Sequence, residues 1–337
     1  MQGTYALRSP FNVNYERRKP RHPHKLPSFP NRGQNSLAFL VECRVKTSTS
    51  DLYSRLTMSH LPRSFATAPI VIVVFVTAIA YSTGSTQIAV AADEPTKPLP
   101  TLFIVGDSTV KNGTKGQQGW GDPLMGLFDK TKIKVENHAI GGRSSRTFQT
   151  EGRWDKILAA AKPGDFVVVQ MGHNDSGPLD DAQRARGSIR GIGDESKEIN
   201  NPITKQTETV HTYGWYLRKY IHDAKEKQMI VIILSPIPHC PEKQVAPGDI
   251  EKSNYVTWSE EVAKAEKVPF LHLNKLIMAH YATLPPAEIK TKYFTEADHT
   301  HTSPAGAAKN AECVAAGIRE LTDVPLKDFL QAPEAAK

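Results

Sequence analysis

The sequence predicts an α/β fold in which a mostly parallel β-sheet is covered by helices on both sides. Continuous apolar runs, typical of strands buried on both faces, recur along the C-terminal two thirds of the chain. Segments with helical periodicity separate these runs. Strands that alternate with helices favour right-handed crossovers, and therefore a sheet of parallel strands between two helical layers.

Five runs predict the strands of this sheet. Four are continuously apolar: 102–105 (LFIV), 166–169 (FVVV), 230–234 (IVIIL) and 270–273 (FLHL). The fifth, at 133–140, mixes apolar and polar residues, so we expect it to lie nearer an edge of the sheet.

Two helices are clearly marked. The first is predicted by an apolar stripe at three- and four-residue steps, formed by Val210, Tyr213, Leu217, Ile221 and Ala224. The second begins at Ser303 and Pro304, which suit the N-cap and the first turn. Its predicted apolar face consists of Ala308, Ala311, Ala315 and Ile318.

The first 92 residues differ in composition from the rest. Residues 1–57 are rich in Arg, Lys, Pro, Ser and Asn, which is typical of a disordered or untranslated stretch. Residues 58–92 have the basic start, apolar centre and Ala-x-Ala end of a secretory signal peptide. The apolar centre is shorter than the about 20 residues of a membrane span, so we expect no stable membrane anchor. We expect translation from Met58, cleavage near Ala91 or Ala92, and a secreted or periplasmic protein.

The positive charge of the chain belongs to this N-terminal part. The whole chain carries a formal net charge of +7. Residues 1–92 contain 11 Lys and Arg and 3 Asp and Glu, a net charge of +8, so residues 93–337 carry −1. The basic charge therefore does not indicate nucleic-acid binding.

Residues 93–337 are enough for one domain with a sizeable core. Only Cys240 and Cys313 of the three cysteines lie in this domain. An oxidising compartment would permit a disulfide between them, and two free thiols are an equal alternative.

Polar and glycine-containing strings follow three of the predicted strands. Ser108 (in Gly-Asp-Ser-Thr) follows the first strand, Gly142 the second and Asn174 (in Gly-His-Asn-Asp) the third. Sites in parallel sheets form at the carboxyl ends of the strands. We therefore expect these three residues to lie together at one edge of the sheet.

Near the C-terminus, Asp298 and His301 are three residues apart. This spacing lets the carboxylate reach the near nitrogen of the imidazole within one turn, leaving the far nitrogen free to accept the proton of Ser108. The sequence thus offers a nucleophile, a base and a group that orients the base. His299 is the competing candidate for the base, with a structural or metal-binding role as its alternative.

Attack on an ester creates negative charge on the carbonyl oxygen, which needs hydrogen-bond donors. The candidates are the backbone N–H groups of Ser108 and Gly142 and the side-chain amide of Asn174. A simple turn at Gly142 and a loop hydrogen bond from Asn174 are the structural alternatives.

Several other polar residues have no assigned role. The segment 176–206 is polar and weakly periodic, with arginines that include Arg184, Arg186 and Arg190, and a loop of this length is often functional. Arg143 and Arg146 lie beside Gly142, where they either bind an anionic sugar or brace loops through carboxylates such as Asp175 or Glu151. Trp120 is expected in the core rather than stacked on sugar.

These strings resemble the blocks of the SGNH (GDSL-type) hydrolases, and more closely those of rhamnogalacturonan acetylesterases. The similar strings are Gly106-Asp107-Ser108, Gly119-Trp120-Gly121, Gly142-Arg143-Ser144-Ser145-Arg146, Glu151-Gly152-Arg153, Gly172-His173-Asn174-Asp175 and Asp298 to Ala307. The resemblance runs from about Leu102 to about Leu321, and the last string is the most specific. Thr109 departs from the wider family, which has Leu there, and 176–206 has no clear match.

The resemblance implies a flavodoxin-like, three-layer α/β/α sandwich around a five-stranded parallel sheet. It also implies a triad of Ser108, His301 and Asp298, an oxyanion hole of Ser108, Gly142 and Asn174, and no metal or other cofactor. The implied reaction removes acetyl groups from the galacturonate-rhamnose backbone of pectin, an acetylated acidic polysaccharide. We expect the protein to be a monomer.

Three alternative functions remain open. One is an esterase for another acylated sugar, such as acetylated xylan, or for lipid-like esters. Another is a dinuclear-metal phosphoesterase, because Gly-Asp, Gly-His-Asn-Asp and the pair His299 and His301 loosely imitate its ligand motifs, although the usual Asp-x-His on the first strand is absent. The third is a non-catalytic carbohydrate-binding protein on the same fold.

Overall fold

The computed structural model describes residues 98–332. The predicted basic segment at 1–57 and the predicted signal peptide at 58–92 lie outside these residues. Within 98–332, none of the helices has both the length and the apolar character of a membrane span.

Five parallel strands form the central sheet in the order β2-β1-β3-β6-β7. Their bounds are Thr101–Gly106 (β1), Lys134–Asn137 (β2), Phe166–Gln170 (β3), Ile230–Leu234 (β6) and Phe270–Leu271 (β7). In this order β1 lies between β2 and β3, which is the flavodoxin-like arrangement. The strand order, and not the strand direction, reverses between β1 and β3. The predicted α/β fold with a five-stranded parallel sheet is confirmed.

The apolar runs form strands because side chains on both faces of the sheet are buried. In β1, Leu102 and Ile104 belong to one hydrophobic core, and Phe103 and Val105 belong to the other. Successive side chains of a strand point to opposite faces, so one continuous apolar run contributes to both cores. One core fills the space between the sheet and each of its two helical layers.

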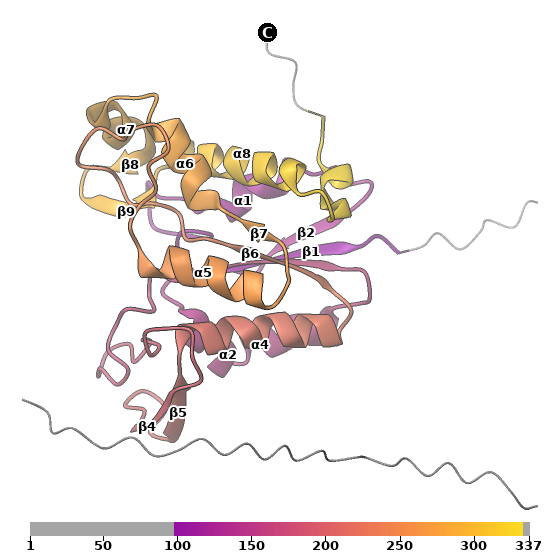
Figure 1. Cartoon of the computed structure of the whole chain (residues 1–337), viewed down its shortest axis with the longest axis vertical. Helices are drawn as coiled ribbons and strands as arrows, with labels where there is room; N and C mark the ends of the chain where they lie inside the picture. The colour runs from indigo at the N-terminus through magenta and orange to yellow at the C-terminus, as the bar shows by residue number, and fades with distance from the viewer. Residues whose placement is uncertain (1–97, 333–337) are drawn as a thin grey trace, which may run out of the picture. The chain divides into compact units, whose positions relative to one another are not determined.

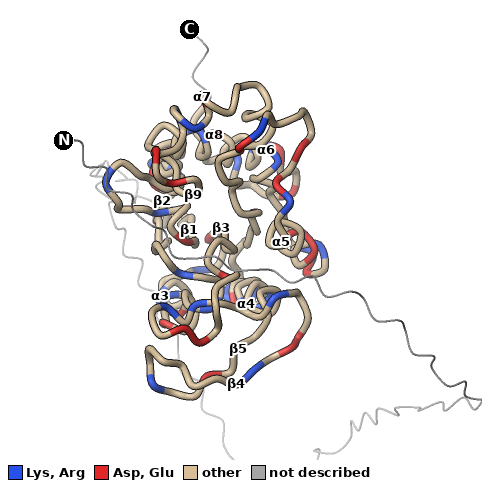
Figure 2. Tube along the Cα trace, turned by 90° about the vertical axis from the view of Figure 1, so that its left-hand side faces the viewer, with Lys and Arg blue, Asp and Glu red and all other residues tan. Residues whose placement is uncertain are grey.

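Helices cover both faces of the sheet (Figure 1). One layer contains Gly121–Met125 (α1), Leu273–Tyr281 (α6), Pro286–Tyr293 (α7) and Pro304–Glu320 (α8). The other contains Ser145–Thr150 (α2), Arg153–Ala160 (α3), Tyr213–Glu226 (α4) and Asn254–Ala265 (α5). Figure 2 shows β1 and β3 between α6, α7 and α8 on one side and α3 and α4 on the other. A 3₁₀ helix, Pro325–Phe329, follows α8.

Two small antiparallel pairs lie outside the central sheet. Ser196–Asn200 (β4) pairs with Thr207–His211 (β5), and Phe294–Thr295 (β8) pairs with Asp298–Thr302 (β9). The predicted 176–206 loop therefore contains a strand. The sequence of β4 shows no alternation of apolar and polar residues, because Ile199 is the only buried residue of this strand.

Two details of the predicted helices were wrong. Val210 belongs to β5, and α4 begins only after Thr212, whose hydroxyl accepts a hydrogen bond from the backbone N–H of Trp215. Val210 is nevertheless fully buried, so its apolar character alone extended the predicted stripe. In α8, Ala308 is exposed and Ala307 is buried instead, whereas the Ser303 cap and the Pro304 start agree with the prediction.

The edge strands are shorter than predicted. The 133–140 run contributes only β2, at the expected edge position. The 270–273 run contributes only the two residues of β7, because α6 starts immediately afterwards. The ring of His272 accepts a hydrogen bond from the N–H of Lys275 and so caps this helix.

Candidate active site

Ser108 lies in a tight turn directly after β1. The carboxylate of Asp107 accepts hydrogen bonds from the backbone N–H and the hydroxyl of Thr109, both at 2.8 Å. The carbonyl of Asp107 accepts the N–H groups of Val110 and Lys111, which closes the turn. A Cβ atom on Gly106 would lie 2.3 Å from a methyl carbon of Val110, so only glycine allows the chain to turn this tightly.

The turn brings Ser108 to His301. The Nε2 atom of His301 lies 2.7 Å from Oγ of Ser108, and its Nδ1 atom lies 2.7 Å from Oδ2 of Asp298. An ionised carboxylate only accepts hydrogen bonds, so Nδ1 carries the proton and Nε2 is the acceptor for the serine hydroxyl. The three residues thus form a continuous hydrogen-bonded chain.

Asp298 is held by the backbone that follows it. Its Oδ1 atom accepts the N–H groups of Thr300 at 2.8 Å and His301 at 2.9 Å. Burial alone would raise the pKa of this carboxyl group, but the hydrogen bonds from His301 and Thr300 hold the pKa well below its usual range. Asp298 therefore stays ionised, as a partner for a protonated imidazole requires.

Gln117 also contacts this carboxylate, a role the sequence did not predict. Its amide nitrogen donates to Oδ2 of Asp298 at 2.9 Å, and its amide oxygen accepts from Asn112 at 2.9 Å. The backbone of Gln118 pairs with that of Thr302. The segment after the nucleophile thus fixes the position of β9, a relationship that only the tertiary fold creates.

The serine opens into a cavity of about 500 Å³, the size of a small-molecule site. Ser108, Gly142, Asn174 and His301 all line it. The three residues predicted to follow three different strands therefore do lie together, whereas Asp298 is behind His301.

Two backbone donors are free at this cavity. Among the described residues, neither the N–H of Ser108 nor that of Gly142 has a protein acceptor. Gly142 has a φ of 79°, a left-handed conformation that favours glycine. The side-chain amide of Asn174 donates one hydrogen to the carbonyl of Arg143 at 2.8 Å, and an amide has a second hydrogen to offer.

Asp175, which follows Asn174 in the chain, joins two segments near this cavity. Its fully buried carboxylate accepts hydrogen bonds from Ser145, through backbone and hydroxyl, and from the hydroxyl of Ser188. Burial raises its pKa to about 6, despite these hydrogen bonds. The carboxylate joins the start of α2 to the loop at 188.

Asp107 and His173 form a second buried pair behind the nucleophile. The Oδ2 atom of Asp107 lies 3.4 Å from Nδ1 of His173, without hydrogen-bond geometry. Burial opposes ionisation of Asp107, but the charge of His173 and the hydrogen bonds from Thr109 lower its pKa. Nε2 of His173 bonds to the carbonyl of Ile237.

The two arginines beside Gly142 have different roles. Arg143 lines the cavity, and its Nε atom lies 3.0 Å from a carboxylate oxygen of Glu151. Arg146 is fully buried and makes a two-pronged contact with Glu208, with both distances 2.7 Å. The bracing alternative therefore holds for Arg143, which pairs with the expected Glu151, and for Arg146, whose partner is neither Asp175 nor Glu151.

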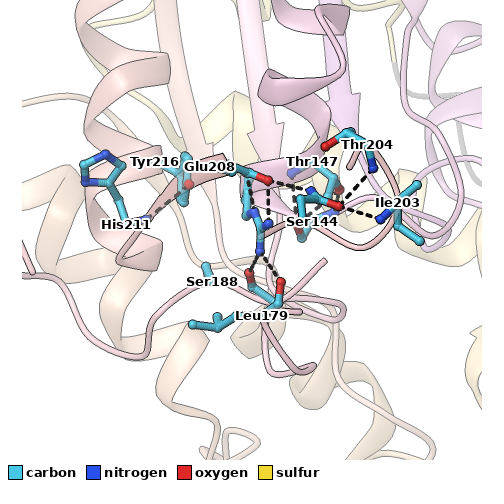
Figure 3. A network of polar contacts seen from close by, with 12 residues as sticks. Ser144, Thr147, Leu179, Ser188, Ile203, Thr204, Glu208, His211 and Tyr216 are labelled. Carbon is cyan, nitrogen blue, oxygen red and sulfur yellow. Dashed lines mark hydrogen bonds and ion pairs between the residues drawn. The ribbon is translucent and has the colours of Figure 1, made fainter. Parts of the chain in front are cut away.

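Arg146 connects three segments that are distant in sequence. It also donates to the carbonyls of Leu179 and Gly187. Glu208 in turn accepts the side-chain amide of Asn201, whose oxygen accepts the N–H groups of Ile203 and Thr204. Figure 3 shows the network extending from Leu179 through Glu208 to Ile203 and Thr204. One buried cation thus anchors the β4–β5 hairpin to the cavity.

The remaining candidates have simpler positions. The side chain of His299 is exposed, and both ring nitrogens of His301 are already bonded to Asp298 and Ser108. Trp120 is fully buried and donates to Gln170, which confirms its core position. Cys240 and Cys313 are free thiols. Within 98–332, no three His, Cys, Asp or Glu side chains are grouped so that they could hold a metal ion.

Comparison with known proteins links this geometry to a family. The model of the GDSL-like Lipase/Acylhydrolase family matches residues 104–309, from β1 into α8. The rhamnogalacturonan acetylesterase of Emericella nidulans is 30% identical over 237 residues, covering 70% of this chain and 91% of that protein. YesY of Bacillus subtilis, named a probable rhamnogalacturonan acetylesterase, is 31% identical over 235 residues, covering 68% and 96%.

A solved structure shares the fold. The crystal structure of the Bacillus subtilis protein YXIM matches with a TM-score of 0.53 and 24% identity. The match covers 66% of this chain and 57% of that one.

Proposed function

The chain belongs to the GDSL-like lipase/acylhydrolase family and is a carboxylic-ester hydrolase; from this premise we propose that it removes acetyl groups from rhamnogalacturonan by a serine mechanism. The single observation that carries the mechanism is the hydrogen-bonded chain from Asp298 through His301 to Ser108. The two relatives named above support the choice of substrate.

In the first half of the reaction, Oγ of Ser108 attacks the carbonyl carbon of the acetyl ester. Nε2 of His301 takes the hydroxyl proton as the new C–O bond forms. Asp298 holds the imidazole in the required tautomer and stabilises the imidazolium that results. The imidazolium then gives its proton to the sugar oxygen, and the bond between that oxygen and the acetyl carbon breaks.

In the second half, water attacks the acetyl group on Ser108 and His301 again takes and returns the proton. Acetate leaves and the serine hydroxyl is restored. Both tetrahedral intermediates carry an oxyanion. We propose that the N–H groups of Ser108 and Gly142 and the side-chain amide of Asn174 donate hydrogen bonds to it. Donors of this kind stabilise the transition state by about 3 kcal/mol each.

The shape of the cavity is compatible with a sugar polymer. It is open, and polar side chains line most of it. A sugar bearing one acetyl group presents mainly hydroxyls and an ester, which need hydrogen-bond partners rather than a deep apolar tunnel. The same features favour a carbohydrate ester over a long-chain lipid ester.

We also propose that the protein acts outside the cytoplasm. A polysaccharide is too large to cross a membrane, so the enzyme must meet it outside the cell membrane. Residues 58–92 also have the pattern of a signal peptide. N-terminal sequencing of the exported form tests this: a start near residue 92 or 93 supports export, and retention of residues 58–92 in a cytoplasmic protein contradicts it.

The central test is acetate release by wild type and Ser108→Ala from acetylated rhamnogalacturonan, acetylated xylan and an aryl acetate. We expect release from rhamnogalacturonan, reduced roughly 10⁴-fold or more in the variant. Release from xylan but not from rhamnogalacturonan would overturn the substrate and leave the mechanism. Loss of activity with EDTA and its return with a divalent cation would favour the metal-dependent alternative.

A further inference from the structure

Two arginines of the 176–206 segment line the same cavity as the serine. Arg184 and Arg186 border it together with Ser108 and His301. In the part of the chain that the structure describes, no carboxylate oxygen lies within 4.0 Å of either guanidinium, whereas Arg143 at the same cavity is paired with Glu151. The cavity therefore presents two guanidinium groups that form no ion pair with a carboxylate of the described residues.

Hydrogen bonds fix the backbone of the segment that carries these arginines. The carboxylate of Asp181 accepts the N–H groups of Gln183, Arg184 and Ala185, at 3.0, 2.8 and 2.8 Å. Ala185 is buried and has a φ of 42°, a conformation that disfavours any side chain. Strain of this kind persists where the surroundings impose it, and it is common at ligand-binding sites.

Arg186 is also tied to the proposed oxyanion loop. Its Nη1 atom donates to the carbonyl of Gly142 at 3.1 Å. Burial and the nearby charge of Arg184 lower the pKa of Arg186, against the opposing charges of Asp107, Asp181 and Asp175, so the two arginines repel each other. A bound anion would relieve this repulsion.

The cavity continues past Arg184 toward the β4–β5 hairpin. A second cavity of about 230 Å³ shares Thr147, Glu151, Arg184 and Ile203 with the first. Ile203 is 51% exposed and borders both cavities. The network anchored by Arg146 holds the backbone N–H of Ile203 beside the two cavities (Figure 3).

We propose that Arg184 and Arg186 form a carboxylate-binding subsite for a uronate unit of the acetylated polysaccharide, and that the polymer continues over Ile203. The inference rests on the proposed function and assigns it a specificity site. A guanidinium matches a carboxylate in shape and charge, and two guanidinium groups in the cavity of the reacting serine select an anionic chain. Ile203 offers an apolar surface against which the C–H groups on one face of a sugar ring can pack.

Arg184→Gln tests the subsite because it removes the charge and keeps a shorter, polar side chain. The readout is the ratio of kcat/KM for acetylated rhamnogalacturonan to kcat/KM for an aryl acetate. We expect this ratio to fall about tenfold, mainly through KM, and Arg184→Lys to restore part of it. In wild type, added salt should lower the same ratio by screening the charge.

Arg190→Gln is the matched control. Arg190 is an exposed arginine of the same segment that lies over the ring of Trp258, at 5.9 Å, and borders neither cavity. Its substitution should leave the ratio unchanged. An equal fall in both glutamine variants would mean that the total charge matters rather than this subsite, and would overturn the proposal.

The outcomes separate this proposal from the proposed function. If wild type releases acetate from rhamnogalacturonan and Arg184→Gln leaves the ratio unchanged, the subsite is wrong and the function stands. If wild type acts on no acetylated polymer, calorimetry with unesterified oligogalacturonate decides: weaker binding to Arg184→Gln than to wild type supports the subsite, and equal or absent binding overturns it.

Discussion

His301 and Ser108 are 193 positions apart in the sequence, yet Nε2 of the first lies 2.7 Å from Oγ of the second. The contact exists because the turn after β1 and the strand β9 meet at the carboxyl edge of the sheet. The paired backbones of Gln118 and Thr302 hold these two segments together.

Asp298→Asn should abolish most of the turnover with little change in fold. The amide cannot stabilise the imidazolium, and it favours the wrong tautomer of His301, so we expect kcat to fall roughly 10⁴-fold. Steady-state kinetics on an aryl acetate measure this. A loss of less than tenfold would show that Asp298 does not orient the base.

The same substitution should change stability in acid. A carboxylate whose pKa is lowered on folding stabilises the protein above its ordinary pKa of 3.8, and this stabilisation is lost as the pH falls through the lower folded value. Wild type should therefore lose stability relative to Asp298→Asn below pH about 4. Urea unfolding at several acidic pH values measures the difference, and parallel curves would contradict it.

Asn174→Ala should lower kcat about 100-fold with little effect on KM, because it removes one donor to an oxyanion that forms only in the transition state. Asn174→Asp should be worse than Ala, since it places a negative charge beside a developing one. Kinetics of both variants on the same ester test the assignment. An aspartate variant as active as the alanine variant would argue against an oxyanion role.

Arg146→Met should destabilise the fold by about 3 kcal/mol, because it leaves Glu208 with no cation in a largely buried site. Arg143→Met is the matched control: its pair with Glu151 is partly exposed, and its loss should cost less than about 1 kcal/mol. Denaturant unfolding measures both. Equal costs would mean that the Arg146 network does not anchor the hairpin.

Asp175→Asn should stabilise the protein at neutral pH and not at pH 4. The pKa of Asp175 rises from 3.8 to about 6 on folding, so the folded protein binds a proton that the unfolded chain releases between these values. Wild-type stability therefore falls as the pH rises through this window, by about 3 kcal/mol relative to the variant. Unfolding at pH 4, 5, 6 and 7 tests this, and a constant difference would contradict it.

The local patterns of the sequence were enough for the fold class and for the proposed catalytic residues. Apolar runs report burial on both faces, and residues that follow parallel strands must meet at one edge of a sheet. The three-residue spacing of Asp298 and His301 also sets their contact locally. These inferences needed no knowledge of which distant segments pack together.

Only the tertiary structure decided the partners and the exact elements. Apolar periodicity reports that Val210 is buried but not whether it lies in a helix or a strand. The sequence offered Asp175 and Glu151 as partners for Arg146, but in the fold Arg146 pairs with Glu208, 62 positions away. Likewise, no local pattern places the amide of Gln117 on Asp298, or Arg184 in the same cavity as Ser108. Long-range polar contacts depend on how the loops close over the sheet edge, and a chain's local propensities do not encode that closure.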